Sequence, residues 1–189
     1  MTGTRQYRLG RRAEQQAQTR QRIVEAAVDL HATVGPATPS ISAIAERAGV
    51  QRHTVYAHFP DETALFEACS SHWIGANPFP DVSEWLEIAD PGQRLRRAIR
   101  DVYAWYDRVE DALALFVRDA HIFPSWGEAR RARLAELADL LAKDLPRRKA
   151  VRAAVGHALE FETWRSLVRE QGMSNRAAAE AMARLAETL

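Results

Sequence analysis

Residues 40–59 place two short amphipathic segments on either side of a glycine, and this layout constrains the fold more than any other feature of the chain. In the first segment, Ile41, Ile44 and Ala48 recur at helical spacing, which gives a short helix one narrow apolar stripe. Gly49 follows the last periodic residue, where a chain leaving a helix often adopts a left-handed conformation. We therefore predict a helix that ends at Gly49 and a second helix that begins just after it.

The second predicted helix has an apolar side and a polar side. Val55 and Phe59 lie four residues apart, so they share the side that packs against the protein. Arg52, His53 and Thr54 fall at its N-terminal end, the part that points at base edges when such a helix enters the major groove of DNA. The pattern predicts a helix-turn-helix whose second helix is free to contact DNA.

This stretch resembles the DNA-binding signature of the TetR family of bacterial transcriptional regulators. The resemblance covers about residues 20–70 and is carried by Ala45, Ala48-Gly49-Val50, Thr54, Tyr56, His58-Phe59 and Leu65-Phe66. It implies a ligand-responsive repressor that binds a pseudo-palindromic operator in double-stranded DNA as a homodimer. The expected DNA-binding residues are Arg12, Ser40, Gln51, Arg52, His53, Thr54, Tyr56 and His58. Among them, we expect the three at positions 52–54 to read bases, and those at 56 and 58 to hold phosphates.

Three positions depart from the family pattern. Glu62 stands where the family usually has a phosphate-binding Lys, so we expect its carboxylate to turn outward or toward the helix N-terminus, where the helix dipole favours it. Gln51 and His53 replace residues that are often small in the family. The two latter changes lie on or beside the DNA-reading side, so they affect which operator is recognised rather than DNA binding itself.

The charge distribution agrees with a DNA-binding N-terminal part. Residues 1–60 carry eight Arg and four acidic residues, whereas residues 61–189 carry 18 basic and 21 acidic residues, within a net charge of +1. Residues 1–12 contain four Arg without an apolar period, which predicts a mobile basic arm. Two roles remain open for this arm: a cationic contact in the minor groove, or a solvated tail.

Helical periods and Gly or Pro breakers predict an all-α fold without strands. We expect a basic flexible arm at 1–12, a helix-turn-helix DNA-binding domain at 13–60, and a helical ligand-binding and dimerisation domain at 61–189. The expected helices outside the motif are 13–33, one capped by Asp61, 83–88, 93–110, 112–121, 126–144, 146–171, and a final helix after Gly172.

Aromatic residues are concentrated in the C-terminal part of the chain. They either fill the helical core or, in part, line a cavity for a small molecule, since such cavities are mostly apolar with few polar groups. The family resemblance favours a cavity for an unidentified inducer. The candidate ligand-binding residues are Tyr103, Tyr106, Phe116, His121, Phe123, Trp126, Phe161 and Trp164.

The last two predicted helices carry apolar faces rich in alanine, which allow helices to approach closely. A two-fold dimer would place two DNA-reading helices on two half-sites, and the resemblance implies that these helices form the interface. The candidate interface residues are Val151, Val155, Ala158, Ala178, Ala181, Met182 and Leu185. The alternative is that these positions face the interior of their own chain.

The remaining signals argue against other classes of protein. The chain has no Gly-rich phosphate loop, nucleophile elbow or paired metal motif, and Cys69 with His72 makes only a weak metal pair, so we expect no catalysis, cofactor or metal. The lone Cys69, the absence of an apolar signal and the lack of a membrane-length apolar run suit a cytoplasmic protein. The alternative function is a helical partner-binding adaptor that has lost DNA binding, to which Glu62 gives some support.

Overall fold

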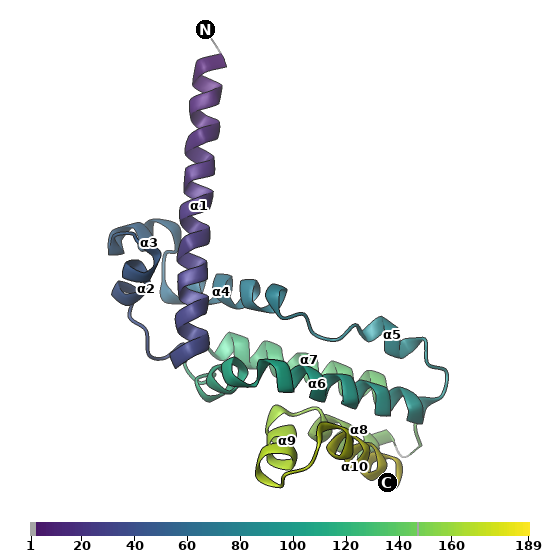
Figure 1. Cartoon of the computed structure of the whole chain (residues 1–189). Coiled ribbons are helices and arrows are strands. Elements are labelled where there is room, and N and C mark those ends of the chain that lie inside the picture. Colours follow the sequence, from purple (N-terminus) through teal and green to yellow (C-terminus); the bar gives the residue numbers. More distant parts are fainter. Residues whose placement is uncertain (1–2, 147) are drawn as a thin grey trace. The chain divides into compact units, whose positions relative to one another are not determined.

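The computed structural model describes residues 3–146 and 148–189, with the backbone alone for residues 3–9 and 148. In this described part the chain is helical and has no strand, which confirms the all-α prediction (Figure 1). The elements are α1 (Gly3–Val34), α2 (Ile41–Ala48), α3 (Arg52–His58), α4 (Glu62–Ala76), α5 (Val82–Leu86), α6 (Pro91–Arg118), α7 (Pro124–Ala142), α8 (Arg148–Ala158), α9 (Phe161–Arg165), a π-helical turn (Ser166–Glu170) and α10 (Asn175–Glu187). No helix within the described ranges is long and apolar enough to cross a membrane.

The chain divides into two compact units. The head unit comprises Met1–Asn77 and Asp111–Phe123, and the C-terminal unit comprises Pro78–Glu110 and Pro124–Leu189. The predicted boundary at residue 60 falls inside the head unit, because α4 packs against α1.

The head unit is built around the second half of α1. Ile23 and Ala27 of α1 are fully buried, and α2, α3 and α4 all pack against this helix. Phe66 of α4 extends this core, since its ring stacks on that of Phe123 with the two ring centroids 3.8 Å apart. Burial of a side chain such as Ile contributes about 1.5–3 kcal/mol, so these contacts fix the position of the short helices that follow α1.

A polar contact fastens the segment between α1 and α2 to the end of α6. Asp119 is buried, and its Oδ2 accepts a hydrogen bond from the backbone N–H of Ala37 at 3.0 Å. The neighbouring Arg118 donates to this carboxylate and also to the carbonyl oxygen of Val34 at 3.1 Å. The hydrogen bonds from Arg118 hold the pKa of Asp119 below its usual value. Gly35 has a φ of +93° and leaves room for this contact, since an added Cβ would collide with the side chains of Arg118 and Asp119.

The C-terminal unit has an aromatic core. Trp85, Tyr103, Tyr106, Phe161 and Trp164 are all fully buried within the chain. Around it, α8 packs against both α7 and α10. The burial of these five rings agrees with core packing, one of the two roles left open for the aromatic residues.

The predicted separation of 93–110 from 112–121 is wrong, because α6 runs unbroken from Pro91 to Arg118. Its apolar period continues through Val109, Leu113 and Phe116, all of which are buried. Neither Gly nor Pro interrupts the sequence between these residues, so the helix has no reason to end there.

The predicted helix 146–171 is also interrupted. The chain leaves the helical conformation at Glu160, whose ψ is 140°, and then forms α9 and the π-helical turn. The buried hydroxyl of Tyr106 donates to the carbonyl oxygen of Leu159 at 2.6 Å and so satisfies a group at the end of α8. Neither Gly nor Pro marks this position in the sequence, and the side chain that bonds to it lies 53 residues away.

The first helix begins ten residues earlier than predicted, at Gly3 rather than Ala13. The prediction of a mobile arm separate from the helix is therefore wrong for residues 3–12, which continue α1. Six of these ten residues, namely four Arg with Gln6 and Leu9, have high helix propensity. Met1 and Thr2 lie outside the described residues, as do the side chains of Arg5 and Arg8.

Two neighbouring tyrosines on α6 should respond oppositely to loss of their hydroxyl groups. We expect Tyr106→Phe to lower the free energy of unfolding by about 1–3 kcal/mol, because it leaves the buried carbonyl of Leu159 without its donor. The hydroxyl of Tyr103 is buried without a hydrogen-bond partner among the described residues, so Tyr103→Phe should be neutral or stabilising. Urea denaturation at equal protein concentrations measures both values. Equal losses for the two variants would contradict this assignment of the hydrogen bond.

Candidate nucleic-acid interface

Local backbone chemistry defines the two short helices of the motif. Ser40 caps α2, with its Oγ accepting the N–H of Ala43 at 3.2 Å. Gly49 ends α2 in the left-handed conformation, with φ 65° and ψ 40°. The N–H of Val50 then donates to the carbonyl of Ala45 at 2.9 Å, which closes the turn. These contacts confirm the predicted end of the helix and show that the Ser40 hydroxyl serves as a helix cap.

Helix α3 packs against the head unit along one side only. Val55 is its buried residue, and Phe59, directly after it, is buried as well. Gln51 precedes α3 in an extended conformation, and its side chain makes no capping hydrogen bond. The apolar anchors therefore hold α3 against the head unit and leave its opposite side exposed.

That exposed side carries most of the predicted DNA-binding residues. Arg52 and His53 are exposed, and the side chain of Tyr56 is 40% exposed. Thr54 and His58 are half-buried at the edges of this surface. The structure thus brings together the predicted residues at positions 51–58, whereas Arg12 lies exposed on α1 and Ser40 at the start of α2.

Arg52 and Tyr56 form a pair on this surface. Nη2 of Arg52 donates to the Tyr56 hydroxyl at 3.3 Å, and the guanidinium carbon lies 5.6 Å from the centroid of the tyrosine ring. The hydrogen bond to Tyr56 raises the pKa of Arg52 above its usual value, and the charge of Glu62 adds to this effect. The predicted base-reading and phosphate-binding groups are therefore in direct contact before DNA is bound.

Glu62 is the first residue of α4 and is exposed. Asp61 provides the cap of this helix, since its Oδ1 accepts the N–H of Ala64 at 2.7 Å. The predicted cap is therefore confirmed. The carboxylate of Glu62 stands at the positive end of the helix dipole and also interacts electrostatically with Arg52.

Two further arginines lie beside α3, and sequence reasoning missed them. The guanidinium carbon of Arg20 lies 4.7 Å from the centroid of the Phe59 ring. A Cβ added at Gly49 would lie 4.0 Å from Nη1 of Arg22, so this side chain lies next to the turn before α3. Both arginines lie outside the apolar stripe of α1, so the sequence indicates that they do not belong to the core. The stripe does not show that α3 lies beside them.

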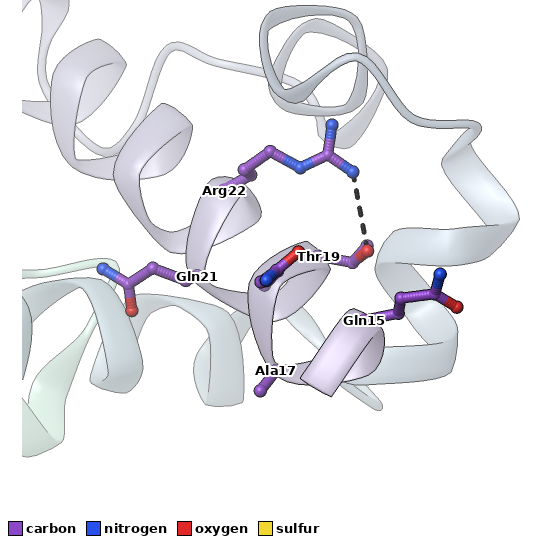
Figure 2. A pocket seen from close by; sticks show the side chains of 6 residues that line it. Gln15, Ala17, Thr19, Gln21 and Arg22 are labelled. Carbon is purple, nitrogen blue, oxygen red and sulfur yellow. Dashed lines mark hydrogen bonds between the residues drawn. The ribbon is translucent and has the colours of Figure 1, made fainter. Parts of the chain in front are cut away.

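The surface of α1 also contains an open hollow of about 890 Å³, shown in Figure 2. Its lining residues all come from this helix: Gln15, Ala17, Gln18, Thr19, Gln21 and Arg22. A smaller hollow of about 270 Å³ lies between α1 and α2, beside the ion pair of Asp29 with Arg47. The larger hollow lies on a single helix and is lined mostly by residues with polar side chains.

The eight predicted ligand-binding residues fall in both units. Phe116, His121 and Phe123 belong to the head unit, where Phe116 and Phe123 contact Phe66 and His121 is exposed. The other five belong to the C-terminal unit. There the structure brings four together, with ring centroids 5.3–6.5 Å apart: Tyr103, Tyr106, Phe161 and Trp164. Trp126 is half-buried on α7.

The predicted interface residues divide into buried and exposed sets. Five are buried within the single chain: Val151, Val155, Ala158, Ala178 and Met182. Only Ala181 and Leu185 are exposed, with Leu185 at 48%. The alternative interpretation, in which these positions face their own chain, therefore applies to the five buried residues, because they fill the contacts of α8 and α10.

Cys69 and His72, for which we expected no metal site, differ in their exposure. Cys69 is fully buried, whereas His72 is exposed on the same helix. The neighbour of Cys69 is instead His31, whose Nδ1 lies 3.2 Å from the sulfur atom. Burial raises the pKa of the Cys69 thiol to about 12, so this group is a poor nucleophile near neutral pH. In the described part of the chain, no three His, Cys, Asp or Glu residues gather closely enough to hold a metal ion.

These features define a helix-turn-helix protein with a separate helical C-terminal unit. Residues 23–69 match the family described as bacterial regulatory proteins, tetR family. The HTH-type transcriptional regulator AcrR from Shigella flexneri is 41% identical over 59 residues, which are 31% of this chain and 27% of that protein. The match thus covers about a quarter of the length of this relative. Residues 23–69 thus carry the similarity of this chain to the TetR family of regulatory proteins.

Solved structures share the fold over most of the chain. A TetR-like transcriptional regulator from Rhodococcus sp. RHA1 has a TM-score of 0.61 at 23% identity and covers 89% of this chain and 93% of its own. The fatty acid degradation regulator FadR from Bacillus halodurans has a TM-score of 0.60 at 18% identity, with 89% and 94% covered. At these identities the likeness establishes the fold alone.

Proposed function

We propose that the chain is a transcriptional repressor that binds a pseudo-palindromic operator as a homodimer and releases it when a small molecule binds. The observation that carries this proposal is the exposed side of α3, where Arg52, His53 and Tyr56 stand on a helix anchored by Val55 and Phe59. Such a helix offers donors for base edges and phosphates when it lies in the major groove.

The decisive experiment selects bound sequences from a random duplex pool at two salt concentrations. Enrichment of an inverted repeat, with affinity that falls as salt rises, supports a dimer that reads sequence and neutralises phosphates. The alternative is a partner-binding adaptor, and the observation that favours it is the carboxylate of Glu62 close to Arg52. No enrichment at either salt concentration would overturn the repressor and leave the adaptor.

Arg52 provides the test of base reading. We expect Arg52→Ala to weaken operator binding by about 1–3 kcal/mol and to relax the preference at one operator position, because a guanidinium can bond two acceptors of a guanine. Affinities for the selected operator and for its single-base variants measure both effects. Arg133→Ala, an exposed arginine of α7 paired with Glu136, is the matched control and should change neither. An equal loss on every sequence would remove Arg52 from the base-reading group.

We place the proposed dimer surface on the exposed sides of α8 and α10. On α10, Ala177, Ala181 and Leu185 are exposed at intervals of four residues, and Ala153 is exposed on α8. These small and apolar side chains lie opposite the residues that fill the C-terminal unit, so a second copy can approach without displacing its core.

We place the proposed ligand site in the C-terminal unit, where the aromatic residues gather. An inducer acts only if it binds two states of the dimer with different affinity, which typically gives a coupling of about 1–3 kcal/mol. Titration of candidate compounds against the operator complex tests this step, and binding without change in operator affinity would exclude induction.

A further inference from the structure

We propose that the N-terminal part of α1, residues 3–22, binds the DNA backbone as a continuous helix outside the base pairs that α3 reads. This inference rests on the proposed DNA binding and adds a second contact surface to it. We call residues 3–22 the α1 extension.

The position of the α1 extension follows from contacts within the head unit. Arg20 lies over the ring of Phe59, at the end of α3, and Arg22 lies next to Gly49, before its beginning. Residues 20–22 are therefore level with α3, and the part of α1 from Gly3 to Thr19 projects past it, as Figure 1 shows. Seventeen residues of helix, at 1.5 Å each, extend about 26 Å, which equals the rise of about seven to eight base pairs.

The described side chains of the α1 extension do not build a core. All residues from Gly10 to Gln18 are exposed, and the buried apolar positions of α1 begin at Ile23. The exposed stretch from Gly10 to Gln18 gains no stability from burial in the core, so core packing of the head unit does not explain why the helix continues there. Its surface includes the hollow lined by three glutamines, Ala17, Thr19 and Arg22 (Figure 2).

The charge of α1 changes along its length. Residues 10–22 carry four arginines and Glu14, whereas residues 23–34 carry Glu25 and Asp29 but neither Lys nor Arg. The cationic half is the half that projects past α3, and the helix dipole places further positive charge at its N-terminus. A polyanion running beside α3 is complementary to this half, and the glutamine amides add donors for phosphate oxygens.

Substitutions at Gly10 test whether the α1 extension must be helical, without changing its charge. A Cβ added at this residue meets no atom within 4 Å, so Gly10→Ala strengthens the helix without a clash. Gly10→Pro removes a backbone donor and breaks the helix, while leaving the apolar core from Ile23 onward untouched. Neither substitution changes the charge of the chain.

The experiment compares operators with long flanks and operators trimmed to the inverted repeat. The unmodified protein and Gly10→Ala should lose affinity on the trimmed operator and protect a longer stretch of the flanked operator in hydroxyl-radical footprints. Gly10→Pro should bind both operators equally and protect only the repeat. Arg12→Ala should keep the footprint centred on the repeat and lower the slope of log affinity against log salt by about 0.9 for each phosphate that the side chain no longer neutralises.

Thermal unfolding of each variant checks that the head unit remains folded. If Gly10→Pro unfolds at a lower temperature than the unmodified protein, the salt slope of Arg12→Ala tests the inference instead. Equal flank dependence for the unmodified protein and Gly10→Pro, with an unchanged salt slope for Arg12→Ala, would overturn the inference while leaving operator binding in place. A protein that enriches no repeat at all would instead overturn the proposed function.

Discussion

The free energy of unfolding is expected to fall by about 3 kcal/mol between pH 6.5 and pH 4 because of one buried side chain, His31. Burial lowers its pKa from 6.5 to about 4 in the folded protein, since the low-dielectric core disfavours the imidazolium. The unfolded chain therefore binds a proton at His31 throughout this range, whereas the folded chain does not. Stability is lost as pH falls through 6.5, and the loss levels off below about 4.

The surroundings of His31 set the size of this effect. Only 4% of the residue is exposed, between the Cys69 sulfur of α4 and the Phe66 ring, whose centroid lies 6.0 Å from that of the imidazole. The thiol carries no charge near neutral pH, because its pKa is raised to about 12. Asp119 raises the pKa of His31, but this attraction is smaller than the effect of burial.

Urea denaturation at several pH values measures this dependence. His31→Gln should flatten the curve between pH 6.5 and 4, whatever its stability at neutral pH. His72→Gln removes an exposed imidazole from α4 and should leave the curve unchanged. The same slope in all three proteins would show that His31 is not the group responsible. Asp119 contributes separately and at lower pH, because its pKa lies below the ordinary 3.8 and its stabilisation is lost only as pH falls below that value.

Local signals in the sequence were sufficient for the DNA-reading motif. The apolar spacing of Ile41, Ile44 and Ala48 and the position of Gly49 depend on contacts within about ten residues, and the structure confirms both. The cap at Asp61 is equally local. The exposed positions of Arg52 and Tyr56 follow from the period of α3, but their contact with each other was not predicted.

Features that depend on distant residues were not predictable in this way. The end of α8 is tied to a hydroxyl on α6, and the buried side of α10 is chosen by its contact with α8. An alanine-rich helix presents small apolar residues on several sides, so its sequence does not tell which side faces the core. For this reason five of the seven predicted interface residues proved to be buried within their own chain.

Leu185→Glu is expected to produce the largest loss of operator affinity, about 100- to 10,000-fold, by separating the two subunits of the proposed homodimer. Linking two DNA-reading heads raises the affinity for a two-half-site operator by this factor, because the second head binds at a high effective concentration. Leu185 is 48% exposed on α10, and a two-fold interface would bring its copies together or against the same partner surface. A carboxylate placed there loses its hydration without gaining a counter-charge, which disfavours association.

Sedimentation equilibrium and operator titration test this expectation together. Leu185→Glu should sediment as a monomer and bind a single half-site as well as the unmodified protein does, since α3 is untouched. Leu86→Glu is the matched control, because this leucine of α5 is 45% exposed and lies in the same unit. If Leu185→Glu remains a dimer with full operator affinity, the exposed side of α10 is not the interface. If Leu86→Glu alone dissociates the dimer, the interface instead includes α5.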